Sequence, residues 1–334
     1  MDLVRGMLCG VIAIGLASAT TASAQQATDT AQTRRAGLLA AAMPAQDAVS
    51  IFEVGEESRL RLKKAINVGK RPGRMCSRPG TLYVATAAGA VAVDLETLAV
   101  TGNFADPAIK SIFGCLVSRD GARLYLMDRD ANLVFVFSTE SRQLLKKLTV
   151  PEDPRYAILT PDGKSVVVSC GDANQLAVID AATDTVQRTI KTIGLDPRSM
   201  LITPDGKDLV VALVSSDVLS WYKADTLEYI NSFGVARSPQ QLAVAPDGDR
   251  LYAGAASEVV AIIDVRQHKA DGMPEPRQAS TIPVGPLYSL AISGDGNYLY
   301  SAPGDGNGVI VDLRFWRVMK PPALKGAATV FYLP

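Results

Sequence analysis

Histidine is almost absent from this chain of 334 residues, which contains a single copy, His268. A Ser-His-Asp arrangement needs a histidine beside its nucleophile, and paired histidines are common ligands of zinc and haem. The sequence also has no CxxCH segment, no glycine-rich phosphate loop after a strand and no carboxylate series with EF-hand spacing. We therefore expect no cofactor, no metal site and no catalytic residue of the usual kinds.

Excess charge of either sign is missing as well, because 34 Lys and Arg residues balance 34 Asp and Glu residues. Without a net positive field, neither nucleic acid nor an anionic membrane is an expected partner. Apolar residues make up 48% of the chain, which is enough for a substantial core. The composition thus indicates a globular protein with a neutral overall balance.

Long apolar runs are lacking except near the start, where a run from about Met7 to Ala17 follows Arg5. This run is shorter than the roughly 20 residues that cross a bilayer, so no membrane span is expected. Small residues, ending in Ala24, come next and are typical of a signal-peptide cleavage site. We predict a signal peptide at 1–24 cleaved after Ala24, a flexible segment at 25–34, and a periplasmic or secreted protein.

Cysteine is scarce in the predicted mature chain, which keeps only Cys76, Cys115 and Cys170. Their number is odd, their spacing is wide and no CxxC is present. These features argue against a disulfide framework and against a metal knuckle. We expect all three to be small, buried, free thiols.

What the sequence does contain is a repeat. Short turn segments ending in Gly recur as SRPG, SRDG, TPDG (twice), APDG and SGDG, at Gly80, Gly121, Gly163, Gly206, Gly248 and Gly296. The intervals are 41, 42, 43, 42 and 48 residues, and the longest contains the polar insertion RQHKADGMPEPRQAS. A period near 42 is the size of one four-stranded propeller blade.

Each repeat has the same internal order, which residues 155–190 illustrate. Apolar runs of strand length (YAILT, SVVVSC, LAVID and VQRTI) are separated by turn-forming segments. In TPDGK, found at 160–164 and 203–207, proline presets the turn, aspartate bonds the backbone ahead and glycine accepts a positive φ. We interpret TPDGK as a hairpin turn between strands and not as a site signature.

The segment LAVIDAATDTVQRTI at 176–190 carries a resemblance to the YVTN-type β-propeller repeat, and the resemblance extends over nearly the whole mature chain. It implies an all-β, seven-bladed β-propeller with four-stranded blades over residues 35–334. It also implies likeness to two kinds of protein: the β chains of quinoprotein amine dehydrogenases and lactonase-type propellers. Fold alone does not define function.

The two ends of the chain complete the blade count. The last segment, ATVFYLP, matches the first strand of a repeat but lacks the turn and outer strands. The segment that begins near Gly37 supplies three strands, and Gly37 lies 43 residues before Gly80. We predict that the C-terminal strand pairs with the N-terminal strands and closes the ring, which leaves no free sheet edge.

A site is expected on the face where the repeats differ. With strands named A to D from the axis outward, the TPDG-type turns join A to B, so the D–A and B–C loops share the opposite face. Six of the seven D–A loops have proline just before strand A, and the residues around it should ring the channel mouth. The candidates for binding a ligand or partner are Arg74, Lys110, Arg155, Arg198, Gln240, Gln241, Tyr288, Asp106, Asp153 and Asp196.

Two interpretations of these residues remain open. Arg155 and Arg198 could bind an anionic small molecule or a peptide carboxylate as paired donors. Alternatively, each could form a salt bridge with a nearby aspartate, Asp153 or Asp196, and cap the channel structurally.

Three functions follow from the sequence. The first is an exported, non-catalytic scaffold that binds a protein partner or a small anionic ligand on the loop face. The second, implied by the resemblance, is a partner subunit of a periplasmic complex like quinoprotein amine dehydrogenase. The third is a lactonase-like hydrolase, which would need acid and base groups at the channel, such as Asp106, Asp153 or Asp196.

Overall fold

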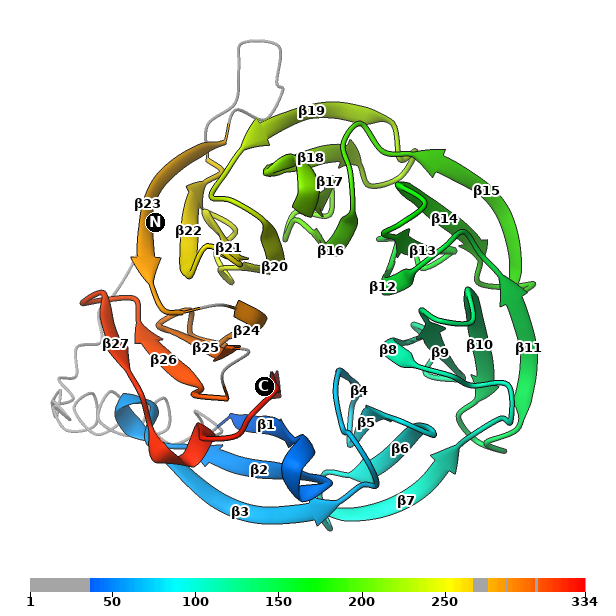
Figure 1. Ribbon diagram of the computed structural model, residues 1–334, viewed down its shortest axis with the longest axis horizontal. Coiled ribbons are helices and arrows are strands. Elements are labelled where there is room, and N and C mark those ends of the chain that lie inside the picture. The colour runs from blue at the N-terminus through cyan, green and yellow to red at the C-terminus, as the bar shows by residue number, and fades with distance from the viewer. Residues whose placement is uncertain (1–36, 267–275, 286, 304–305, 334) are drawn as a thin grey trace, which may run out of the picture. The chain divides into compact units, whose positions relative to one another are not determined.

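The computed structural model describes residues 37–266, 276–285, 287–303 and 306–333, and these form seven four-stranded antiparallel sheets set as blades around a central axis (Figure 1). The predicted all-β, seven-bladed propeller is confirmed. The predicted signal peptide, its cleavage site and segment 25–34 lie outside the described residues. Within the described residues, no helix is both long and apolar enough to cross a membrane.

Each of blades 1 to 3 consists of four strands that are consecutive in sequence. Blade 1 comprises β4 (Met75–Arg78), β5 (Thr81–Thr86), β6 (Gly89–Asp94) and β7 (Ala99–Phe104). Blade 2 comprises β8 (Ile112–Val117), β9 (Arg123–Asp128), β10 (Leu133–Ser138) and β11 (Leu144–Thr149). Blade 3 comprises β12 (Pro154–Leu159), β13 (Ser165–Cys170), β14 (Gln175–Asp180) and β15 (Thr185–Lys191).

Blades 4 to 6 continue the series. Blade 4 comprises β16 (Pro197–Ile202), β17 (Asp208–Leu213), β18 (Val218–Lys223) and β19 (Tyr229–Gly234). Blade 5 comprises β20 (Pro239–Val244), β21 (Arg250–Ala255), β22 (Val259–Asp264) and β23 (Arg277–Pro283). Blade 6 comprises β24 (Leu287–Ile292), β25 (Tyr298–Pro303), β26 (Val309–Asp312) and β27 (Arg317–Met319).

Blade 7 joins the two ends of the described chain. Its strand order is β28 (Thr329–Leu333), β1 (Leu38–Met43), β2 (Ala48–Val54) and β3 (Leu60–Asn67). The register runs from Leu38 opposite Leu333 to Ala42 opposite Thr329, so the predicted ring closure is confirmed. Short 3-10 turns lie at Pro44–Gln46, Glu56–Ser58, Val214–Ser216 and Pro322–Leu324.

Gly37 stands where the other blades have their turn glycines, but it serves a different purpose. No A–B turn exists in blade 7, because strand A comes from the other end of the chain. A Cβ on Gly37 would lie 1.9 Å from the hydroxyl oxygen of Tyr332, whose ring stacks on Tyr300. Glycine is needed here to make room for the aromatic ring of the closing strand.

The apolar core lies between the blades. The middle strands are buried along their length, as in β9 and β13, because a blade packs against a neighbour on both of its faces. The outermost strands are mostly exposed, as in β15. Phe104 of blade 1, for example, packs edge-to-face against Phe137 of blade 2. Runs rich in Val, Leu and aromatic residues therefore appear in the sequence without strict polar alternation.

The TPDG segments are the predicted A–B turns, and they also connect the blades. Gly163 and Gly206 have φ of 72° and 74°, and Asp162 accepts the backbone N–H of Lys164. In addition, the ring of Pro161 lies against Gly206 of the next blade. The repeated proline thus contributes to the packing between blades as well as to its own turn.

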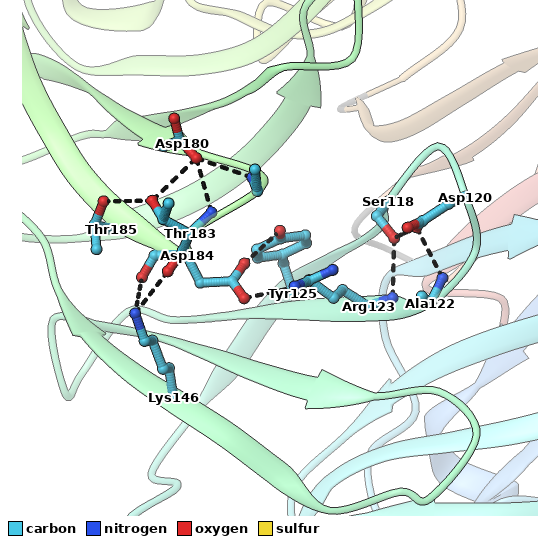
Figure 2. A network of polar contacts seen from close by, with 11 residues as sticks. Ser118, Asp120, Ala122, Arg123, Tyr125, Lys146, Asp180, Thr183, Asp184 and Thr185 are labelled. Atoms are coloured by element: carbon cyan, nitrogen blue, oxygen red, sulfur yellow. Dashed lines mark hydrogen bonds and ion pairs between the residues drawn. The ribbon is translucent and has the colours of Figure 1, made fainter.

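A polar contact of another kind links blades 2 and 3 (Figure 2). Asp184, on the C–D turn of blade 3, is buried and accepts from Arg123 Nε at 2.7 Å and from the Tyr125 hydroxyl at 2.8 Å. Lys146 Nζ donates to the backbone carbonyl of Thr183 at 2.6 Å. Burial and the bond to Asp184 raise the pKa of Tyr125, so its phenol stays a donor. This network satisfies a buried carboxylate and is structural.

The expectation of three free thiols is wrong for two of them. Cys76 on β4 and Cys115 on β8 form a disulfide, with Cα atoms 5.8 Å apart, and Cys170 is the one free cysteine of the described residues. The two cysteines are separated by 39 residues in sequence, which is close to one blade repeat. A separation of one repeat brings residues together on adjacent inner strands, so wide spacing did not exclude a bridge.

Removing residues 328–334 should destabilise the protein severely. The deletion removes β28, including the buried side chains of Val330 and Leu333, and leaves the edge of β1 unpaired. We expect a loss of at least about 4 kcal/mol in the free energy of unfolding, or aggregation, by circular dichroism melting. Deletion of residue 334 alone is the control, and an unchanged melting temperature in the longer truncation would contradict ring closure.

The cysteine pairing gives a labelling prediction for residues 25–334. Burial raises the pKa of Cys170 to about 12, so the native, unreduced protein should not react with iodoacetamide at this thiol. After unfolding without reductant, mass spectrometry should find one modified cysteine, Cys170. After unfolding with reductant it should find three. Modification of Cys76 or Cys115 before reduction would show that the bridge is absent.

Candidate functional site

The inner strands share an irregularity that sets where their first side chains point. In blades 2 to 6 the pairing of strands A and B shifts register just after the start of strand A. Such a bulge turns one residue out of the normal alternation. In blade 3 the bulged residue is Arg155, which is buried, and the next residue, Tyr156, lines the channel.

All seven blades contribute to the wall of a central cavity of about 220 Å³, each with one residue at an equivalent position and with at least one neighbour. The residues at this equivalent position, here called the channel ring, are Arg74, Gly114, Tyr156, Ser199, Gln241, Ser289 and Thr329. The ring contains a single cation, and no carboxylate and no histidine. Its remaining members are neutral and mostly capable of hydrogen bonding.

The small hydroxyl groups of the ring are engaged in contacts between blades. Ser199 accepts the backbone N–H of Leu242 at 3.1 Å, and Ser289 both accepts from and donates to the backbone of Val330. Thr329 donates to the Gly73 carbonyl at 2.6 Å. These groups stabilise the ring, and the side chains left to meet a ligand come chiefly from Arg74, Tyr156 and Gln241.

Arg155 and Arg198 form salt bridges with the aspartates that precede them by two residues. Arg155 pairs with Asp153, and Arg198 makes two bonds of 2.9 and 3.1 Å with Asp196. Both carboxylates lie against Gly171, where a Cβ would be 2.4 Å from an Asp153 oxygen. Of the two interpretations, the geometry agrees with structural ion pairs for these arginines.

Asp153 is more deeply buried than Asp196, and its environment is correspondingly different. Burial raises the pKa of Asp153 by more than the nearby Arg155 lowers it. Its second carboxylate oxygen, Oδ1, lacks a hydrogen bond and lies 3.6 Å from Arg129 Nε. The ionised carboxylate therefore depends on Arg155 for most of its compensation.

Arg74 differs from the other two arginines because it has no carboxylate partner among the described residues. Its guanidinium donates to the Tyr156 hydroxyl and, at 2.7 Å, to the Tyr288 carbonyl. It also stacks on the rings of Phe113 and Tyr156, at 5.3 and 4.7 Å from their centroids. Burial is the main reason that the pKa of Arg74 is lowered, and Arg155 and Arg198 lower it further.

Tyr156 is the central residue that the sequence analysis missed. Its hydroxyl accepts hydrogen bonds from Arg74 and from Gln241 Nε2, and burial raises its pKa, so the phenol keeps its proton. With two donors already directed at its oxygen, the hydroxyl proton is available to an acceptor in the cavity. The one signal in the sequence was its place directly after Arg155 in a proline-led inner strand.

The remaining candidates divide into two groups. Gln241 lines the cavity, Gln240 accepts from Arg198, and the Tyr288 side chain is exposed while its carbonyl binds Arg74. Asp106 pairs with Lys147 at 2.7 Å, and Lys110 is exposed. Neither Asp106 nor Lys110 is among the residues that line the cavity.

Comparison with known proteins supports the repeat identified above. Residues 145–226 match the family described as YNCE-like beta-propeller. This match confirms the predicted kinship with repeat propellers over blade 3 and its surroundings. No match to a curated protein was found.

Solved structures resemble the chain over most of its length. A suggested 6-phosphogluconolactonase from Bacteroides fragilis has a TM-score of 0.75 and 15% identity, with 91% of this chain and 99% of that chain covered. A protein of unknown function from Desulfotomaculum acetoxidans has a TM-score of 0.75 and 12% identity, with 89% and 98% covered. Hydrazine synthase of Kuenenia stuttgartiensis has a TM-score of 0.64 and 18% identity, with 80% and 90% covered. At these identities the likeness shows the fold alone.

Replacing Arg155 and replacing Arg74 should have different effects on stability. Arg155→Met leaves Asp153 buried without its cation, so we expect a loss of about 3 kcal/mol, largely restored by adding Asp153→Asn. Arg74→Met removes a partly buried charge that has no carboxylate partner among the described residues, so stability should change by less than about 1 kcal/mol. Urea unfolding monitored by fluorescence gives both values. Equal losses for the two variants would refute the distinction.

Proposed function

We propose that the protein is an exported binding module that holds an anionic group in its central cavity, with Arg74 as the anchor. The observation that carries this proposal is the charge of Arg74, which no carboxylate of the described residues neutralises. A partly buried guanidinium without a counter-ion is costly, and an anionic ligand would supply the missing charge. Export rests on the signal peptide predicted at residues 1–24.

The donors around the cavity support this choice of ligand. A guanidinium can bind a carboxylate or phosphate through two hydrogen bonds, and Arg74 uses only part of its donor capacity on Tyr156 and Tyr288. The Tyr156 proton adds a neutral donor beside it. A cavity of about 220 Å³ suits a small anion, or the carboxylate end of a larger molecule.

Binding is favoured over hydrolysis by the composition of the channel ring. Lactone hydrolysis needs a general base close to the bound substrate. No Asp or Glu is among the described residues that line the cavity, and the candidate carboxylates Asp153 and Asp196 are paired with Arg155 and Arg198. The lactonase alternative and the redox-partner alternative therefore rest on likeness of fold alone.

The test is titration calorimetry of residues 25–334 with acetate, malonate, sulfate and inorganic phosphate. At least one anion should bind to the unsubstituted protein. Arg74→Gln should weaken that binding by about 10- to 100-fold, since a hydrogen bond to a charged group contributes about 1.5–3 kcal/mol. The matched control is Arg237→Gln, which removes an exposed cation from the D–A loop that precedes blade 5.

Two results would overturn the proposal. One is the absence of binding by all four anions at concentrations of about 10 mM, which corresponds to a negligible affinity. The other is equal binding by the unsubstituted protein and Arg74→Gln. Circular dichroism spectra of each variant show whether the fold is retained.

A further inference from the structure

The D–A loops that lead into blades 1 and 2 carry exposed cations that form no ion pair within the described part of the chain. Lys70 and Arg71 lie on the loop at 68–74, and Lys110 lies on the loop at 105–111. None of the three forms a salt bridge with another described residue. These three side chains are here called the basic sector, and their loops enter adjacent blades (Figure 1).

Two aspartates do contact these loops, but their carboxylates accept hydrogen bonds from backbone N–H groups and not from the side chains of the basic sector. Asp128, which is fully buried, accepts the backbone N–H groups of Lys110 and Ser111 at 2.6 and 3.1 Å. Asp47 accepts the backbone N–H of Arg71 at 3.4 Å. The aspartate on the second loop, Asp106, pairs with Lys147 instead. The loops are therefore held in place while the charges of the basic sector remain available.

The position of Arg71 shows how this sector arises. The residue before the proline of strand A has a positive φ in several blades: 52° at Arg71, 62° at Asp153 and 58° at Asp196. In blades 3 and 4 this residue is an aspartate that neutralises the arginine two residues later. In blade 1 an arginine replaces it, so the same place adds charge near Arg74.

Lysines on the opposite face are compensated locally. Lys164 and Lys207, on the A–B turns of blades 3 and 4, lie 3.7 and 3.5 Å from the aspartates of their own turns. The chain has no net charge, so the basic sector is a local asymmetry of the loop face and not part of a general positive field.

We infer that the basic sector is a docking surface for an acidic segment of a partner protein. An extended peptide can cross both loops, and one of its carboxylates can enter the cavity to meet Arg74. A bilayer surface or a nucleic-acid duplex is too broad to reach a recessed cavity of about 220 Å³. The contact with Arg74, and with it the preference for a peptide over a bilayer or a duplex, rests on the proposed function. Contact between the peptide and the loops does not require it.

The test is fluorescence anisotropy with a fluorescein-labelled peptide of eight glutamates and residues 25–334 of the protein. The double substitution Lys70→Glu with Lys110→Glu should weaken binding at least about 10-fold, which is about 1.4 kcal/mol. The matched control, Lys164→Glu with Lys207→Glu, changes the net charge equally on the opposite face and should weaken binding less than about 3-fold. Added salt should weaken the peptide complex.

Three results would overturn the docking surface: no peptide binding, equal weakening by both double variants, or tighter binding to phosphatidylglycerol vesicles than to the peptide. These failures are separable from failure of the anion site. If Arg74→Gln loses malonate binding but the double variant Lys70→Glu with Lys110→Glu keeps peptide binding, only the docking surface is wrong. If the same double variant loses peptide binding but no small anion binds to the unsubstituted protein, only the cavity proposal is wrong.

Discussion

The pairing of β28 with β1 is the contact on which the rest of the structure depends. Each blade is a single sheet whose two faces are largely apolar, so it is stable only between two neighbours. In an open arc of seven blades, the first and last would each expose one of these faces. The hydrogen bonds between Leu38–Ala42 and Thr329–Leu333 place the seventh blade between the first and the sixth. The core, the turns that pack from blade to blade and the channel all follow from this closure.

Closure of the ring also brings the equivalent residues of all seven blades together at the axis, where the candidate site lies. Every blade places a residue of the channel ring at the axis, so six side chains and the backbone of Gly114 meet in a small volume. A repeat protein would by default place similar residues there, and seven like charges could not be tolerated. In this chain six members of the channel ring are neutral and one, Arg74, is charged. Arg74 is thus the position at which the ring departs from neutrality, and the proposed anion site is built on it.

The features that could be predicted from the sequence are those that repeat. The turn glycines, the strand-length runs and the fragmentary last segment were sufficient for the number of blades, the face of each loop and the closure. The features that could not be predicted depend on which residues become neighbours around the ring. Cys76 and Cys115 are 39 residues apart in sequence. Their proximity becomes evident only when the inner strands of adjacent blades are aligned, because the separation is close to one repeat. Tyr156 was missed because the bulge after Pro154 decides which of two consecutive residues faces the channel.

The distinction between the three arginines shows how a short local pattern can settle the role of a charge. In the segments Asp153-Pro154-Arg155 and Asp196-Pro197-Arg198, the aspartate has a positive φ. Its carboxylate forms a salt bridge with the arginine that follows the proline. The local pair is formed within three residues, so it needs no ligand. In Arg71-Pro72-Gly73-Arg74 the residue before the proline again has a positive φ, but it is an arginine. The second arginine stands one residue further along, in the channel ring. The aspartate that neutralises the arginine in blades 3 and 4 is therefore absent from blade 1. The lack of a carboxylate partner for Arg74 among the described residues and the added charge of Arg71 both follow from this replacement.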